Sequence, residues 1–497
     1  MSNINEEISS GSTVHKILKH GSVYFLVSVL GKGAALLLLP IYTRLLSPTD
    51  YGILSTITAT GAVLAVIMSL RLDAAFGRFF YEYNSDRNEL NTLLSSCFWF
   101  AISLGLIVYL SSLFLGYFYY HKVLHIQFVP LIVLGFFTPL LGQIALLGTI
   151  YYRQTHQSKV VGGIQIIVLV LIHLLSILLL LYTDMTVNAR IIPAFIGGVV
   201  TCTYYVILNV KSGLLSFKFD STLLFKILPY SLAMLPGVLS SWINGLSDRI
   251  ILSIYGPMSE TGIYSVGYEI GRGLTTVTMA IAMVYTPIMY AKLTQDYEAG
   301  IASLTKPILG FFWLMSMLTF FLCIFAKDII YLFAAKEYQG ASSIVIIIIC
   351  SFFWGGQYLI FSNILGFKKK ILLLSSIGIA SALINIILNL MFIPVFGKFA
   401  AAWTTFLSVF VYAILIIYFG YRYSKPKIDW PRMFKVCLIL CLLIIIYFVS
   451  YHFIDGLPLF IVKLLMIPMS LALTIKFEIF QINDFPFPDA ISKWLLR

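Results

Sequence analysis

Several charged side chains lie deep inside long apolar stretches, where a protein can carry them only for a reason. Lys32 is about 12 residues into the first stretch, which at 1.5 Å per residue is about 18 Å deep, near a bilayer midplane. In a later stretch, Glu269 and Arg272 are spaced so that they can pair on one helix face. A charge at the bilayer centre costs on the order of 2.5–3.5 kcal/mol, so these residues predict a polar cavity or a buried ion pair.

A second group follows the second apolar stretch. Arg71, Arg78 and Glu82 are spaced so that a continuous helix would place them on one face, whereas Asp73 would point elsewhere, toward a neighbouring helix. Asp248 and Arg249 are adjacent in the seventh stretch. Two simpler interpretations stay open. The arginines could be topology anchors near the cytoplasmic end, and the adjacent opposite charges could form a salt bridge near the outer surface.

These candidates have a cationic excess, which would suit an anionic head group because arginine forks bind phosphate oxygens bidentately. The carboxylates could be proton or sodium sites, or could hold the arginines in place. His173, alone in the fifth stretch, favours a hydrogen-bonded core residue over a proton relay. The predicted substrate-binding cations are Lys32, Arg71, Arg78, Arg249 and Arg272, and the predicted ion-coupling or structural carboxylates are Asp73, Glu82, Asp248 and Glu269.

Other chemistry is not indicated. The six cysteines show no CxxC or Cys/His metal spacing, so we expect free thiols, no metal and no cofactor. The sequence lacks the DxD and DDxxD clusters that would indicate a membrane glycosyltransferase. We therefore expect no catalytic residue. The formal charge of +12 arises mainly in short connections, where it sets membrane orientation, so we expect no nucleic-acid partner.

The elements that position these residues are membrane helices. The chain is 60% hydrophobic and 11% charged, far from the composition of soluble domains. Its long unbroken apolar runs predict an all-α integral membrane protein rather than a barrel. Basic residues favour one side by about three to one, which places both termini in the cytoplasm, and the polar first 19 residues do not resemble a signal peptide. We expect about 14 spans, near 20–45, 50–70, 93–118, 127–151, 160–182, 190–210, 227–254, 261–290, 306–334, 341–366, 371–393, 399–420, 433–452 and 457–476.

An internal repeat is visible at an offset of about 210 residues. Residues 47–55 align with 257–265, which pairs Asp50 with Glu260 and Gly52 with Gly262. Ordinary helix-start chemistry is the alternative explanation. An even number of spans between the copies predicts two six-helix lobes related as a parallel repeat, plus a C-terminal helix pair. The expected parts are a cytoplasmic tail (1–19), an N-lobe (20–211), a linker (212–226), a C-lobe (227–420), a second linker (421–432) and the last two helices with the C-terminal tail (433–497).

Four stretches resemble the Wzx-type polysaccharide flippases of the multidrug/oligosaccharidyl-lipid/polysaccharide exporter superfamily. They are Tyr-Thr-Arg-Leu-Leu-Ser-Pro-Thr-Asp-Tyr-Gly (42–52), Leu-Asp-Ala-Ala-Phe-Gly-Arg-Phe-Phe-Tyr-Glu (72–82), Leu-Ser-Asp-Arg-Ile-Ile-Leu (246–252) and residues 385–403, which begin Asn-Ile-Ile-Leu-Asn. The final two spans carry no such motif. The roles of individual residues do not transfer, because sugar specificity in these proteins is not written in a shared motif.

The resemblance implies a flippase of the bacterial inner membrane, not an enzyme. It would move an undecaprenyl-pyrophosphate-linked sugar unit, such as an O-antigen repeat for lipopolysaccharide, to the outer leaflet by alternating access. The implied partners are that lipid-linked oligosaccharide, membrane lipids, H+ or Na+ as coupling ion, and a polysaccharide polymerase machinery. The alternatives are a multidrug or cation antiporter, a peptidoglycan-precursor (lipid II) flippase and, from another class, a membrane glycosyltransferase or polymerase.

Overall fold

The computed structural model describes residues 31–479 apart from 32, 35, 455 and 478. Its regular secondary structure is helical throughout these residues, which confirms the predicted all-α class. Twelve continuous helical segments in this part of the chain are long and apolar enough to cross a membrane. Eleven of them coincide with one predicted span each, and the segment Ile371–Ser424 contains two. The first predicted span, 20–45, lies largely outside the described residues.

The helices divide into two compact units, one ending at Ser265 and the other beginning at Val266. The first unit contains α3 (Leu39–Leu45), α4 (Pro48–Ser69), α5 (Leu72–Tyr83), α6 (Arg87–Gly116), the π-helical η1 (Tyr117–Val123) and η2 (Phe128–Ile132), α7 (Val133–Gln154), α8 (Ser158–Tyr182), α9 (Asn188–Lys211) and α10 (Ser221–Tyr255). Helix α11 (Met258–Gln295) runs through the division.

The second unit holds the rest. It contains α12 (Tyr297–Ala302), α13 (Thr305–Ile324), α14 (Ala326–Phe333), the 3-10 turn η3 (Lys336–Ala341), α15 (Ser342–Gln357), α16 (Leu359–Phe367), α17 (Ile371–Ser424), α18 (Trp430–Phe453) and α19 (Gly456–Lys476). Helix α10, which the sequence assigns to the C-lobe, packs against α4, α5 and α6 of the first unit. The lobe boundaries and the membrane orientation stay predictions.

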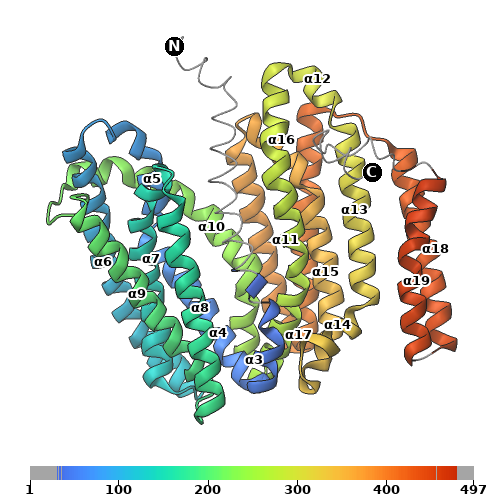
Figure 1. Ribbon diagram of the computed structural model, residues 1–497, viewed down its shortest axis with the longest axis horizontal. Coiled ribbons are helices and arrows are strands. Elements are labelled where there is room, and N and C mark those ends of the chain that lie inside the picture. Colours follow the sequence, from blue (N-terminus) through green and yellow to red (C-terminus); the bar gives the residue numbers. More distant parts are fainter. Residues whose placement is uncertain (1–30, 32, 35, 455, 478, 480–497) are drawn as a thin grey trace. The chain divides into compact units, whose positions relative to one another are not determined.

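Helix α7 is the centre of the first unit. Helices α4, α5, α6 and α9 all pack against it, and Figure 1 shows α6, α7 and α9 as adjacent rods. Its buried side chains include Phe136, Leu140 and Leu147. Because α7 contributes to three apolar clusters in this unit, each polar side chain buried between the helices needs a partner.

Helix α17 is a hairpin. Pro394 lacks the N–H that a helix interior requires, and Gly397 takes a positive φ of 56°, which only glycine adopts easily. The two arms then pack antiparallel, with Asn385 Nδ2 donating to Ser408 Oγ at 3.1 Å and the Thr404 hydroxyl donating to Asn389 Oδ1. These contacts confirm two predicted spans, and they show that the asparagines join two helices.

Helix α4 starts at the first copy of the repeated motif. The Ser47 hydroxyl accepts from the backbone N–H of Asp50, and Asp50 Oδ2 accepts from the backbone N–H of Ser47, both at 3.2 Å. This reciprocal pair is a capping box that satisfies two N–H groups at the helix start. Helix-start chemistry therefore explains part of this motif.

Candidate functional site

Eight of the nine predicted charged residues are described, and they form four ion pairs. Each pair joins residues no more than four positions apart, so each is local to one helix or one helix break. The ninth, Lys32, lies outside the described residues. The pairs are Arg71–Asp73, Arg78–Glu82, Asp248–Arg249 and Glu269–Arg272.

Arg71 lies in a break between α4 and α5, so the prediction of one continuous helix face for Arg71, Arg78 and Glu82 is wrong. Leu70 and Arg71 have φ values of 45° and 64°, in the left-handed region that non-glycine residues rarely enter. The Ser231 hydroxyl of α10 donates to the backbone carbonyl of Leu70 and holds the break from outside. No glycine or proline marks positions 70 and 71, which is why the sequence pattern does not reveal the break.

The break brings Arg71 against Asp73. Arg71 Nη2 lies 3.2 Å from Asp73 Oδ2, so the expectation that Asp73 points toward a neighbouring helix is also wrong. Arg71 Nε and Asp73 Oδ1 are buried and have no hydrogen-bond partner among the described residues. A buried polar atom without a partner costs about 1–3 kcal/mol. This pair therefore retains an unused donor and an unused acceptor for a polar ligand or water.

The pair Arg78–Glu82 is a surface pair along α5. Its Nη1–Oε1 distance is 2.9 Å, and 53% of the Arg78 side chain and 42% of the Glu82 side chain are exposed. Exposed pairs at this spacing contribute only about 0.3–0.5 kcal/mol. The arrangement suits an anchor at a membrane surface at least as well as a substrate contact.

The pair Asp248–Arg249 in α10 is almost fully buried, with 1% and 3% of the side chains exposed. Arg249 Nη1 donates to the backbone carbonyl of Gly245 at 2.7 Å and lies 3.5 Å from Asp248 Oδ1. The Tyr264 hydroxyl of α11 donates to Asp248 Oδ2. Sequence reasoning missed Tyr264, although it lies inside the repeated segment 257–265. This hydrogen-bonded charge pair joins the last turns of α10 to the start of α11, and removing either member would leave a buried charge.

Glu269 and Arg272 pair along α11 as the spacing predicts. Arg272 Nη2 donates to Glu269 Oε2 at 2.6 Å, and both side chains are partly exposed. The local pairing is therefore confirmed. A role in binding substrate or an ion stays a prediction for all nine residues.

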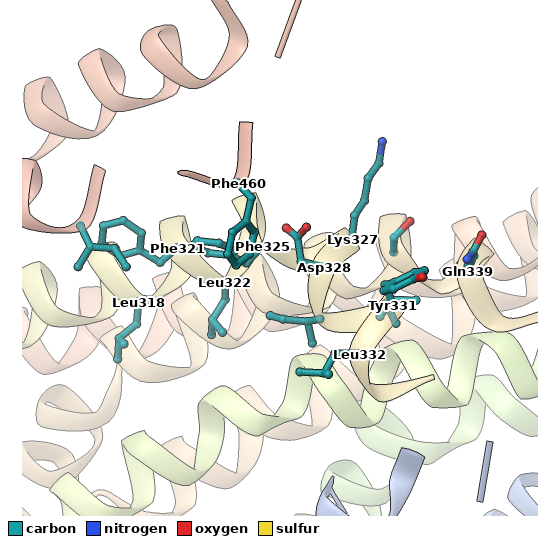
Figure 2. Close-up of a pocket in the computed structure, with 14 residues that line it drawn as sticks. Leu318, Phe321, Leu322, Phe325, Lys327, Asp328, Tyr331, Leu332, Gln339 and Phe460 are labelled. Carbon is teal, nitrogen blue, oxygen red and sulfur yellow. The ribbon is translucent and has the colours of Figure 1, made fainter. Parts of the chain in front are cut away.

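Two polar groups were not predicted as sites. Lys463 of α19 donates to Asp328 of α14 at 2.6 Å, with only 6% of the lysine side chain exposed. This pair adjoins a cavity of about 1020 Å³ with a mainly apolar lining, and Figure 2 shows Phe321, Phe325 and Phe460 beside Asp328. A lysine inside an apolar span was the sequence signal for Lys463, the same signal that singled out Lys32.

The second group joins three helices of the first unit. The Tyr42 hydroxyl of α3 lies 2.7 Å from His173 Nδ1 of α8, and Arg190 Nη1 of α9 lies 3.4 Å from the same nitrogen. The Arg190 guanidinium also stacks over the Tyr42 ring, 3.9 Å from its centroid. His173 is hydrogen-bonded, as predicted, but its partners are polar and charged rather than those of an ordinary core.

Comparisons with known proteins place this fold. A family model described as "Polysaccharide biosynthesis protein" matches residues 17–292. A protein of the Lsg locus of Haemophilus influenzae is 24% identical over 378 residues, which cover 75% of this chain and 90% of that protein. An uncharacterized membrane protein of the same organism is 25% identical over 284 residues, covering 56% and 66% of the two chains.

Two solved structures are similar in fold. A structure described as lipid II flippase MurJ in an inward closed conformation has a TM-score of 0.68 at 14% identity, covering 93% of this chain and 98% of that one. An inward-facing multidrug resistance MATE family transporter of the MOP superfamily has a TM-score of 0.59 at 14% identity, covering 81% and 94%. The chain therefore shares the fold of these two solved structures, and the twelve apolar segments among the described residues are those of a multi-pass membrane protein.

Proposed function

Because the chain belongs to the polysaccharide biosynthesis protein family, we propose that it is a flippase for an undecaprenyl-pyrophosphate-linked sugar unit. It would move this unit from the inner to the outer leaflet by alternating access, for assembly into a surface polymer such as O-antigen. The family match covers residues 17–292, and the fold resembles that of the lipid II flippase structure over 93% of the chain. No covalent bond changes in such a reaction.

The physical task explains the charges. A sugar pyrophosphate cannot cross hydrocarbon without large desolvation costs, so the protein must offer it a polar route while its lipid tail stays in the membrane. Arginine suits this task because its planar fork binds two phosphate oxygens at once and keeps its charge in an apolar environment. Of the predicted cations, Lys32, Arg71 and Arg272 would contribute to this route.

The helix break at Arg71 is the observation that carries the proposal. Arg71 keeps an unpartnered buried Nε, and 31% of its side chain is exposed. Asp73 neutralises part of its charge and orients the guanidinium at 3.2 Å. A phosphate oxygen would satisfy the free N–H, and the carboxylate would prevent the anion from binding too tightly to be released.

The buried pair at 248 and 249 would have a different role. Arg249 already donates to Gly245 and Asp248, and Tyr264 donates to Asp248, so this pair has little freedom to take a ligand. We assign it to holding α10 against the start of α11. Glu269 and Glu82 would be structural carboxylates or coupling sites for H+ or Na+.

Deletion of the gene tests the proposed function. We expect the surface polymer to disappear while lipid-linked repeat units accumulate on the cytoplasmic leaflet, as measured by extraction after labelling from each side. A deletion strain with normal polymer and no accumulated intermediate would contradict it. Polysaccharide polymerase machinery would be the downstream partner, so its lipid-linked substrate should fall in the outer leaflet of the same strain.

Lipid II is the second candidate cargo, because the structural neighbour with a TM-score of 0.68 is described as a lipid II flippase. Rescue of cells depleted of their own lipid II flippase would favour this cargo, and failure to rescue would favour the polysaccharide unit. A drug antiporter would need an acidic or aromatic cavity. Drug export abolished by neutralising an acidic residue would favour that function.

A further inference from the structure

We propose that Tyr42, His173 and Arg190 form a proton-binding site that couples transport to the proton gradient, and that a proton on His173 Nδ1 excludes the Arg190 contact. This inference rests on the proposed function and names its coupling ion. Three helices supply the site: α3 brings Tyr42, α8 brings His173 and α9 brings Arg190. The carboxylates predicted from the sequence take no part in it.

The contacts define the protonation state of the ring. Arginine has only N–H donors, so Arg190 Nη1 at 3.4 Å requires a lone pair on His173 Nδ1. The Tyr42 hydroxyl at 2.7 Å can donate to the same lone pair. His173 is therefore neutral in this arrangement, with its proton on Nε2.

Protonation would reverse both contacts. A hydronium ion supplies the proton: one of its O–H bonds breaks, an N–H bond forms at Nδ1, and a water molecule is left. The charge of the three-residue group rises from +1 to +2. The new N–H must donate, so the Tyr42 hydroxyl would turn to accept from it. Arg190 would then lose its acceptor on the His173 ring, and the positive charge of the ring would repel its guanidinium. Arg190 would therefore move away from His173.

Movement of Arg190 away from His173 would require the start of α9 to move. Arg190 is in the first turn of α9, and its guanidinium lies 3.9 Å from the Tyr42 ring centroid as well as near His173. The contact thus ties the start of α9 to α3 and α8. A proton on His173 would release this tie, and loss of the proton would restore it. Such a two-state contact is what coupling an ion to alternating access requires.

The position of the site suits proton entry from outside. His173 is nine residues before the end of α8 at Tyr182, about 14 Å along the helix, and α9 begins at Asn188. In the predicted orientation this end faces the outer side. Protons driven inward would therefore reach this end of the helices first.

No carboxylate faces the ring to compete for the proton in the described part of the chain. The third helix packed against α8 is α7, and its titratable side chains are in its last residues, at the opposite end of α8. Arg44 of α3 is exposed and donates to the Pro40 carbonyl at 3.2 Å. The titratable or charged side chains of the helices packed around His173 at this end are Tyr42, Arg44 and Arg190, with Tyr51 of α4 interacting with Arg190.

The test replaces His173 with a side chain that accepts but cannot be protonated. His173→Asn places an amide oxygen where Nδ1 was, so Tyr42 and Arg190 keep their acceptor. Polymer export is measured in cells with nigericin, which removes the pH gradient. We expect export by the natural chain to fall several-fold with nigericin, and export by His173→Asn to be low and unresponsive. His452→Asn, an exposed histidine in α18, is the matched control and should behave like the natural chain.

Two results would overturn the proposal. One is export by the natural chain that ignores nigericin, and the other is a His173→Asn variant with normal export that still responds to it. Neither affects the flippase assignment, which fails only if deleting the whole chain leaves export and lipid-linked intermediates unchanged.

A second measurement does not depend on a variant being active. In the full chain labelled with 15N-histidine, the ring signal lost in His173→Asn should show a bare Nδ1 at neutral pH and two N–H groups after acidification. Tyr42→Phe, which keeps the ring under Arg190, identifies the same signal if His173→Asn does not fold. A His173 ring that carries its neutral proton on Nδ1, or that takes up no proton on acidification, would contradict the proposal.

Discussion

Gly52 and Gly262 lie against each other's helix in a reciprocal contact. A Cβ added to Gly52 would be 1.9 Å from the carbonyl oxygen of Met258, and a Cβ added to Gly262 would be 1.9 Å from the carbonyl oxygen of Pro48. The repeat offset of about 210 residues maps each of these contacts onto the other. The aligned glycines that revealed the repeat are therefore the point at which the starts of α4 and α11 meet.

Substitution at this contact should destabilise the fold. In Gly52→Ala or Gly262→Ala the methyl group would meet a backbone oxygen far inside van der Waals distance, so the helices must separate, at about 1–3 kcal/mol. Thermal unfolding in detergent would show a lower midpoint. Gly142→Ala in α7 is the control, since nothing lies within 4 Å of its Cβ position and alanine favours a helix by about 1 kcal/mol. Equal midpoints for all three variants would contradict the close contact.

The buried pair in α10 should be sensitive to a change that leaves a charge behind. Asp248→Asn leaves the Arg249 guanidinium without its carboxylate at a site where 3% of the side chain is exposed, and breaking a buried pair costs about 3–5 kcal/mol. The apparent unfolding midpoint in detergent measures the loss. Glu82→Gln in the exposed pair of α5 should cost about 0.5 kcal/mol or less. A loss at Asp248 no larger than at Glu82 would argue against a role in holding α10.

Unequal burial makes the Lys463–Asp328 pair asymmetric. Asp328→Asn leaves Lys463 without its carboxylate, and only 6% of the Lys463 side chain is exposed. Lys463→Met leaves Asp328 without its cation, but 36% of the Asp328 side chain is exposed and can be hydrated. We expect Asp328→Asn to loosen α19 from α14 more than Lys463→Met does. Trypsin cleavage after Lys427, between α17 and α18, would report the loosening. Faster cleavage in Lys463→Met than in Asp328→Asn would contradict the ranking.

The sequence predicts the helices well because each crossing needs a long apolar run, and that requirement is local. It predicts the two arms of the α17 hairpin, near 371–393 and 399–420, for the same reason. It fails at Arg71, because the break depends on two left-handed residues held by Ser231, which lies some 160 positions away. The sequence also does not indicate a site at Arg190, because a basic residue near a helix end has the pattern of a topology anchor. Only the structure shows its contacts with Tyr42 and His173.

Arg71 offers the sharpest test of the substrate route. Arg71→Lys keeps the charge but removes Nε and the planar fork, and Arg71→Gln removes both. Loss of a charge-assisted hydrogen bond of about 1.5–3 kcal/mol corresponds to roughly a tenfold to hundredfold weaker contact. Export is measured as the amount of surface polymer at equal protein levels in the membrane. We expect it to be highest with the natural chain, lower with Arg71→Lys and lowest with Arg71→Gln. Arg78→Lys and Arg78→Gln are the matched controls in the exposed pair of α5 and should export near normally. If all four variants export alike, the helix break at Arg71 does not bind the sugar pyrophosphate. Lys32 would then be the next cation to neutralise.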